Sequence, residues 1–171
     1  MTTATDIVVR MGELAVSADA GACLVTIGLG SCIGVVLVDR VRRVAGLAHV
    51  MLPQVRPGQA DGLPVAARGK YGDLAVPALV DAMLAAGARR LGLQVALVGG
   101  ARMFGAGSGN LDVGARNEAA VRDALTAARL RVRAAATGGD KGRTVRVGVG
   151  SGQVLVRMAQ RADDVIMQGA A

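Results

Sequence analysis

A long uncharged stretch, residues 20–38, constrains the fold of this chain more than any other feature. It is long enough in principle to cross a bilayer, but glycines interrupt it and β-branched residues fill much of the rest. Two buried strands, at residues 24–27 and 33–38, explain it better than a membrane span. Because a polar turn and a third strand at residues 44–51 follow, we expect a hairpin here.

The rest of the chain alternates short strands with two helices. Asp73 is predicted to cap the first helix, which runs to about residue 86, and the second spans about residues 117–129. Short strands are predicted at residues 7–9, 91–98, 130–135, 144–149 and 153–158, before a frayed or helical tail beyond Arg161. This pattern favours an α+β fold, a layered α/β sandwich with mixed, largely antiparallel sheets and two main helices. A length of 171 residues fits a single domain over residues 1–171.

Two glycine-containing segments are candidate functional loops. Residues 54–69 are predicted to form a surface loop that borders the site. Residues 99–114 are rich in glycine, but they lack both the Gly-Lys-Ser/Thr ending of a phosphate loop and the spaced glycines of a dinucleotide site. An access loop or tight turn is therefore preferred to a nucleotide site.

A net charge of +7 raises the question of an acidic partner. Tyr71 and Phe104 are the only aromatic residues, so a platform for stacking nucleic-acid bases is missing. We therefore expect no nucleic-acid binding, whereas electrostatic attraction to an acidic protein surface stays open. The arginine-rich third quarter of the chain is a candidate docking face.

Two cysteines and one histidine are the candidates for reactive chemistry. Charged residues interrupt the first segment too early for a signal peptide, so Cys23 and Cys32 are expected to be free thiols in a reducing cytosol. Together with His49 they would give only three metal ligands at unhelpful spacing, and no metal or cofactor is predicted. Cys23 has no evident partner and is assigned to the core.

The predicted hairpin brings Cys32 close to His49. A symmetrical turn of even length centred between Arg40 and Val41 places these two residues directly opposite each other, with Cβ atoms about 4.5–5.5 Å apart. An adjacent imidazole can take the thiol proton and hold a thiolate–imidazolium pair. A turn of odd length would shift the register by one residue and weaken this prediction.

Neighbouring residues complete a candidate cysteine hydrolase site. Gly30 and Ser31 leave the backbone before Cys32 lightly substituted, so main-chain N–H groups there can stabilise an oxyanion. Thr26, on the adjoining strand, is the nearest polar residue that can orient His49 through its hydroxyl or carbonyl. The alternative is structural, because buried cysteines and lone histidines are common in protein cores.

The chain resembles the CheD family of chemoreceptor glutamine deamidases. Six blocks carry the resemblance in the family's order: LGSCIGVVLVD at 29–39, GLAHVMLP at 46–53, KYGDLAVPALVDAML at 70–84, VGGARMF at 98–104, VGARN at 113–117 and GGDKGR at 138–143. The blocks extend over most of residues 26–156. The resemblance implies a layered α/β sandwich and a cytoplasmic protein-glutamine glutaminase that needs no cofactor.

The family's activity implies a role for each candidate residue. Selected glutamines of methyl-accepting chemotaxis receptors become glutamates, and ammonia is released. The catalytic residues of the family map onto Cys32 as nucleophile, His49 as general acid and base, and Thr26 as the orienting residue. The resemblance also implies binding to the cytoplasmic region of receptors and, in some organisms, to the phosphatase CheC.

Three positions depart from the family pattern. Ala48 and Val50 flank the histidine where an asparagine and an aromatic residue are usual, and Ala136 replaces an acidic residue at a predicted turn. The first pair is expected to affect how His49 is held or how substrate docks, and Ala136 a surface contact. Two other functions stay open: a docking module that regulates a phosphatase or receptor without catalysis, and a cysteine hydrolase of other amides or esters.

Overall fold

Two five-stranded β-sheets form the body of the protein in a computed structural model that describes residues 5–103 and 112–169. The first, sheet A, has the strand order β1 (Thr5–Val8), β3 (Ala22–Leu29), β8 (Arg143–Gly148), β9 (Val154–Met158) and β10 (Asp164–Met167). The second, sheet B, has the order β2 (Leu14–Ser17), β5 (Val44–Val50), β4 (Ile33–Asp39), β6 (Gln94–Gly99) and β7 (Val132–Thr137). Only the pairs β1–β3 and β6–β7 are parallel, so the predicted mixed, largely antiparallel arrangement is confirmed for the described residues.

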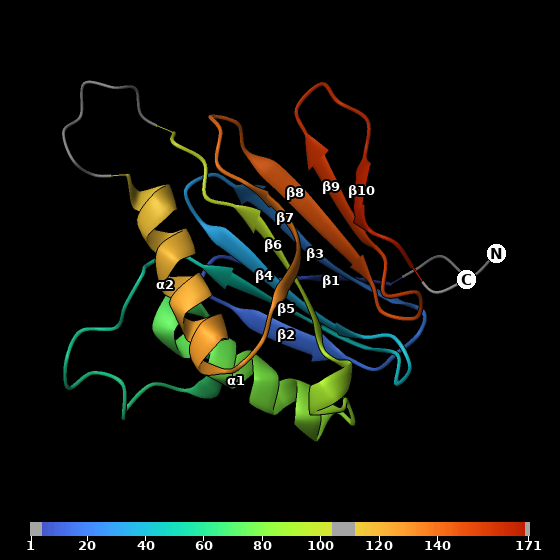
Figure 1. Ribbon diagram of the computed structural model, residues 1–171, viewed down its shortest axis with the longest axis horizontal. Coiled ribbons are helices and arrows are strands. Elements are labelled where there is room, and N and C mark those ends of the chain that lie inside the picture. Colours follow the sequence, from blue (N-terminus) through green and yellow to red (C-terminus); the bar gives the residue numbers. More distant parts are fainter. Residues whose placement is uncertain (1–4, 104–111, 170–171) are drawn as a thin grey trace.

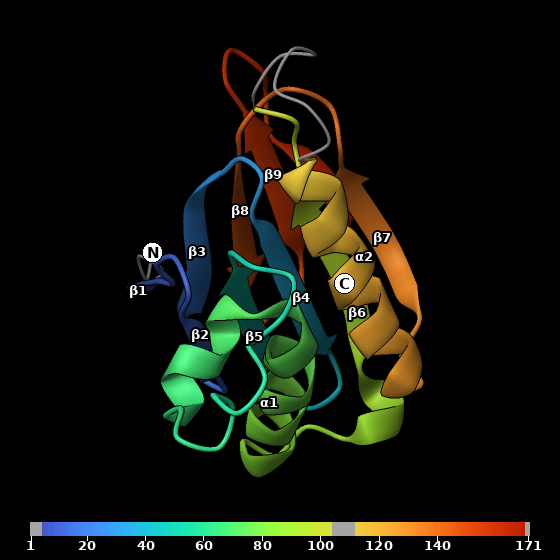
Figure 2. The same cartoon turned by 90° about the vertical axis from the view of Figure 1, so that its left-hand side faces the viewer.

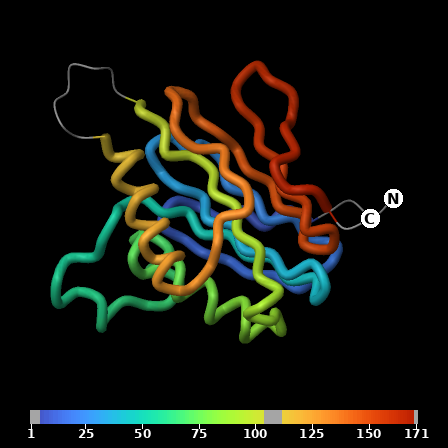
Figure 3. Tube along the Cα trace, in the orientation of Figure 1, coloured from blue at the N-terminus to red at the C-terminus, as the bar shows by residue number. Residues whose placement is uncertain are grey.

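Helices cover one face of sheet B and leave the other face to sheet A (Figures 1 and 2). These are α1 (Gly72–Ala85) and α2 (Val113–Ala127), with two short 3-10 helices, η1 (Val65–Lys70) and η2 (Arg90–Gly92). The segment between β5 and η1 extends away from the sheets (Figure 3). The molecule therefore has three layers, with sheet B in the middle.

Sheet B is buried on both faces, which explains the uncharged sequence of its central strand. On β4, Val36 and Val38 belong to the core between the sheets, whereas Val35 and Leu37 belong to the core under the helices. Every residue of β4 and β5 is buried. The uncharged stretch thus forms β3 and β4, and no helix within 5–103 or 112–169 is long and apolar enough to span a membrane.

Several element predictions were wrong in detail. Asp73 does not cap α1, because Tyr71 is the first flanking residue and the Asp73 carboxylate instead accepts a hydrogen bond from the Val55 N–H. The tail beyond Arg161 is a strand, β10, that pairs antiparallel with β9. Strand β2 was not predicted, and η2 takes the first residues that were assigned to the strand now seen as β6.

Candidate active site

The β4–β5 hairpin places His49 opposite Gly34, so the predicted pairing of His49 with Cys32 is wrong by two residues. Asp39 pairs with Val44, which leaves a turn of four residues rather than two. The Asp39 carboxylate closes this turn by accepting hydrogen bonds from the turn's backbone, and Arg43 adopts a positive φ of 53°. Because the shift is by an even number, Cys32 and His49 stay on the same face of sheet B.

Cys32 lies one residue before β4, half-buried, and packs against the core between the sheets. His49 projects from β5 into the same layer and is 1% exposed. The two residues are therefore diagonal neighbours, a relationship that separates Cα atoms by about 7–8 Å in a regular ladder and is bridged by long side chains. No hydrogen bond joins them, although both lie in the described part of the chain.

Thr26 meets His49 across the space between the sheets. Its Oγ1 lies 2.7 Å from His49 Nδ1 and 2.7 Å from the carbonyl oxygen of Val9. The hydroxyl has a single proton, and the Val9 carbonyl can only accept, so the hydroxyl donates to Val9 and accepts from His49 Nδ1–H. The neutral imidazole therefore keeps its lone pair on Nε2, which is buried without a partner among the described residues.

Burial favours the neutral form of both reactive side chains. It raises the pKa of the Cys32 thiol, and it lowers the pKa of His49, an effect that a hydrogen bond with the Val9 carbonyl partly offsets. The resting pair is thus a thiol and an imidazole rather than the thiolate–imidazolium pair that adjacent side chains would form. In this state His49 Nε2 carries a lone pair that can accept a proton.

The turn before β4, residues 30–32, has each of its carbonyl groups held by the protein. Gly30 accepts from the Ala101 N–H at 2.8 Å, and Cys32 accepts from the Gly100 N–H at 2.8 Å. Ser31 accepts from Asn117 Nδ2 at 3.0 Å. Among the described residues, no acceptor bonds the N–H groups of Ser31 and Cys32.

The last residue of β6, Gly99, allows this close packing. Gly99 has a φ of 111°, and a Cβ atom there would overlap the carbonyl oxygen of Cys32. The Gly99 carbonyl in turn accepts from the Gly138 N–H and from Nη1 of the buried Arg143, at 2.9 and 3.2 Å. Two of the sequence blocks that carry the family resemblance, residues 98–104 and 138–143, therefore meet beside the turn at residues 30–32, which is called the nucleophile turn below.

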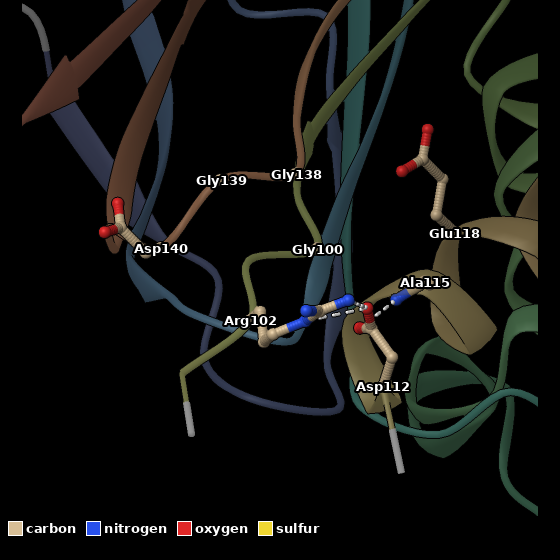
Figure 4. A pocket seen from close by; sticks show the side chains of 8 residues that line it. All are labelled: Gly100, Arg102, Asp112, Ala115, Glu118, Gly138, Gly139 and Asp140. Atoms are coloured by element: carbon tan, nitrogen blue, oxygen red, sulfur yellow. Dashed lines mark hydrogen bonds and ion pairs between the residues drawn. The ribbon is translucent and has the colours of Figure 1, made fainter. Parts of the chain in front are cut away.

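An open pocket of about 440 Å³ adjoins the same turn (Figure 4). Its lining residues are Gly100, Arg102, Asp112, Ala115, Glu118, Gly138, Gly139 and Asp140. The Arg102 side chain points to Asp112, which also caps α2 by accepting from the Ala115 N–H. Gly100 connects the pocket to Cys32, but none of Cys32, His49 and Thr26 lines it.

The other singled-out residues lie outside this cluster. Cys23 is buried on β3, where strand alternation turns it away from the face that carries Thr26. Ala48 and Val50 face the helices, so their departures from the family pattern do not touch the His49 ring. Ala136 lies in β7 and packs against the core between the sheets, not at a surface turn.

The two predicted loops and the metal-ligand candidates can be compared with the described residues. In the predicted loop 54–69, the first residues are anchored to α1 through Asp73 and the last form η1. The glycine-rich segment 99–114 includes residues 104–111, which lie outside the described residues. Within the described residues, no three His, Cys, Asp or Glu side chains are grouped to hold a metal ion.

Asn117 is the site residue that sequence reasoning missed. It is fully buried on α2, and Nδ2 donates to the carbonyl groups of Ser31 and Met51. A usable signal was present, because Asn117 shares the buried face of the helix with Val121 and Leu125 at helical spacing. A polar residue on such a face needs buried hydrogen-bond partners.

Comparisons with known proteins identify relatives of this chain. The profile described as CheD chemotactic sensory transduction matches residues 51–158. A Methanococcus vannielii protein named probable chemoreceptor glutamine deamidase CheD is 38% identical over 92% of this chain and 97% of its own. A protein of the same name from Symbiobacterium thermophilum is 41% identical over 91% of this chain and 93% of its own.

A solved structure is much more distant. The crystal structure of Bacillus licheniformis hypothetical protein YfiH aligns with a TM-score of 0.44 and 12% identity, over 75% of this chain and 50% of that one.

Proposed function

Since this chain belongs to the CheD family, we propose that it is a chemoreceptor glutamine deamidase with Cys32 as nucleophile, His49 as acid and base, and Thr26 as the orienting residue. The names of its relatives support the substrate and the reaction. The observation that carries the site is the 2.7 Å contact between Thr26 Oγ1 and His49 Nδ1, on the layer that also holds Cys32.

The first half of the reaction forms a thioester. His49 Nε2 takes the proton of the Cys32 thiol as Sγ attacks the side-chain carbonyl carbon of the glutamine. The carbonyl π electrons move onto oxygen, and the tetrahedral intermediate collapses when His49 returns the proton to the amide nitrogen. The carbon–nitrogen bond then breaks, and ammonia leaves.

The N–H groups of Ser31 and Cys32 are proposed to bind the oxyanion of this intermediate. Both lack acceptors among the described residues, and they belong to Cys32 and to the residue directly before it. Preorganised backbone donors of this kind stabilise charge that develops only in the transition state. Gly30 contributes by leaving room for the Met103 side chain, which a Cβ atom at this position would crowd.

The second half restores the thiol. His49, neutral again, removes a proton from water as the oxygen attacks the thioester carbonyl. Collapse of the second tetrahedral intermediate expels Cys32, which regains the proton from His49, and the substrate keeps a carboxyl group. Burial keeps His49 in its neutral form between these steps, because it lowers the pKa of the ring. The cycle consumes one water and needs no cofactor.

Partners follow from the proposed reaction. The substrate is the cytoplasmic region of methyl-accepting chemotaxis receptors, so the proposed place of action is the cytoplasm. A phosphatase of the CheC type is a second proposed partner, one that competes with receptors for the protein. Purified CheC from the same genome should slow deamidation if it competes in this way.

Mass spectrometry of a receptor substrate tests the proposal directly. The protein is incubated with cytoplasmic fragments of receptors from its own genome, and glutamine sites are examined for conversion to glutamate. Conversion by the wild type and none by Cys32→Ala is the expected result. Receptor or CheC binding without conversion would instead support the docking module, and conversion of unrelated amides a general cysteine hydrolase.

A further inference from the structure

We propose that Asn117 is a positioning residue for this reaction, and that it aims the Cys32 backbone N–H at the substrate oxyanion. The inference rests on the proposed function, because the oxyanion belongs to the deamidation intermediate. Asn117 contacts neither the nucleophile sulfur nor the His49 ring, so it acts through the backbone of the nucleophile turn.

The contacts of Asn117 join three distant parts of the chain. Nδ2 donates to the Ser31 carbonyl and to the Met51 carbonyl, each at 3.0 Å. Ser31 comes directly before the proposed nucleophile, and Met51 lies two residues after His49. A single amide group on α2 therefore holds the turn that carries Cys32 and the strand end that carries His49.

Because of peptide geometry, the hydrogen bond from Asn117 to the Ser31 carbonyl also fixes the direction of the Cys32 N–H. The Ser31 carbonyl and the Cys32 N–H belong to one planar trans peptide group, in which they point in opposite directions. Because Asn117 fixes the carbonyl on the α2 side, the Cys32 N–H points away from α2. The same reasoning applies one residue earlier, where Ala101 holds the Gly30 carbonyl and so orients the Ser31 N–H.

Polarisation strengthens the donor that is aimed in this way. A carbonyl that accepts a hydrogen bond shifts electron density along its peptide group, so the N–H of the same group becomes a better donor. Asn117 thus both orients and strengthens the Cys32 N–H. The second contact, to Met51, keeps that donor in register with β5 and therefore with His49.

The energetic cost of burying the polar Asn117 side chain argues against a role in packing alone. Asn117 is 0% exposed, and its Oδ1 has no hydrogen-bond partner among the described residues. An unpaired buried acceptor destabilises the folded protein, a cost that an apolar residue would avoid. The neighbouring Val121 and Leu125 supply the apolar packing of this helix face.

The test separates oxyanion stabilisation from nucleophile access. Asn117→Leu keeps the number and branching of the side-chain heavy atoms and removes both hydrogen bonds, and Asn117→Ser is the second variant in case the larger leucine does not fit. Leu125→Ala is the matched control, because it weakens the packing of the same helix without touching the turn. Thermal unfolding ranks the stability of all three variants.

Three measurements are compared for each protein. The first is receptor deamidation, as kcat and KM. The second is reversible binding of a peptide in which an aldehyde replaces the glutamine carboxamide, where the Sγ–carbon bond forms and the thiol proton ends on the former carbonyl oxygen. The third is alkylation of Cys32 by iodoacetamide, which develops no oxyanion.

We expect Asn117→Leu to lower kcat about 10- to 100-fold and to weaken aldehyde binding by a similar factor, since a misaimed donor resembles a lost one. The KM and the alkylation rate of Asn117→Leu should stay within about threefold of wild type. For Leu125→Ala, kcat, KM, aldehyde affinity and alkylation rate should all stay within that range. Asn117→Ser should show the same selective losses.

Three results overturn the inference. One is an equal loss of alkylation, aldehyde binding and kcat in the Asn117 variants, which would mean general disorder of the turn. The second is aldehyde binding by these variants that matches the wild type, and the third is a wild type that binds no aldehyde. A wild type that binds the aldehyde but converts no receptor glutamine refutes only the proposed function.

Discussion

The Thr26 hydroxyl accepts a hydrogen bond from His49 Nδ1–H at 2.7 Å and donates its own to the Val9 carbonyl. This relay of two hydrogen bonds determines which ring nitrogen can act as a base. Removing the hydroxyl leaves Nδ1–H without its acceptor and frees the ring to change tautomer. The consequence should be larger for catalysis than for folding.

Thr26→Val tests this relay with little change of shape. We expect kcat to fall about 10- to 100-fold, because the basic nitrogen is no longer held toward Cys32. Unfolding should cost about 1–3 kcal/mol less, since a buried donor and a buried carbonyl lose their partner. Thr26→Ser, which keeps the hydroxyl, should retain most activity. Equal activity of the valine and serine variants would remove Thr26 from the site.

Burial of neutral His49 makes stability depend on pH. The unfolded chain takes up a proton near the ordinary value of 6.5, whereas the pKa of His49 is lower in the folded protein. The free energy of unfolding should therefore fall as pH drops from 6.5 through the folded pKa, and gain nothing from this group above 6.5. Urea unfolding between pH 7.5 and 5 measures the slope.

His49→Gln provides the comparison for that slope. Carboxylates contribute to both proteins, so the difference between the two curves isolates the imidazole. The variant should lose less stability on acidification than the wild type. Parallel curves would show that His49 titrates alike in the folded and unfolded states.

The neutral resting pair predicts an unusual alkylation pattern. Burial raises the pKa of the Cys32 thiol, and no hydrogen bond from His49 opposes this. Iodoacetamide should therefore label Cys32 in His49→Gln within about threefold of the wild-type rate at neutral pH, although deamidation falls at least about 100-fold. A labelling rate that collapses with deamidation would reveal a preformed thiolate.

Cys23 serves as the internal reference for the labelling experiment. It is 7% exposed, and burial raises its pKa as well, so it should react more slowly than the half-buried Cys32. Peptide mapping after partial alkylation distinguishes the two sites. Faster labelling of Cys23 would indicate that the nucleophile turn is closed to small reagents.

Gly99→Ala should displace the nucleophile turn. A Cβ atom at this position overlaps the Cys32 carbonyl oxygen, and the φ of 111° disfavours any side chain. We expect a loss of about 2–3 kcal/mol of stability together with a large fall in kcat. Gly58→Ala is the control, because its φ is also positive, at 80°, and a Cβ there meets nothing within 4 Å. The Gly58→Ala variant should lose only the stability that a side chain at positive φ costs, and its activity should not change.

Much of the hairpin was predictable because local chemistry decides it. The uncharged, β-branched run required buried strands, and spacing placed Cys32 and His49 across one hairpin. The assignment of Thr26 to a strand adjoining that hairpin was wrong, because β3 belongs to sheet A and Thr26 reaches His49 from the facing sheet. The register was not predictable, because the Asp39 carboxylate captures two turn N–H groups and Arg43 enters the left-handed region. These contacts lengthen the turn by two residues.

Other features depend on packing that no local pattern contains. Strand β10 forms because it pairs with β9, and its sequence DVIM offers only two β-branched residues as a local strand signal. Asn117 was visible as a polar residue on a buried helix face, but its partners lie 86 and 66 residues away. Only the assembled layers bring those carbonyl groups to one amide.

This long-range contact bears on when the protein becomes active during synthesis. A nascent chain emerging from the ribosome exposes Thr26, Cys32 and His49 well before α2, because the chain is made from its N-terminus. On the proposed role of Asn117, those three side chains gain an aimed oxyanion donor only after α2 docks. On that role, a partly synthesised chain that lacks α2 should deamidate glutamines more slowly than the complete, folded protein.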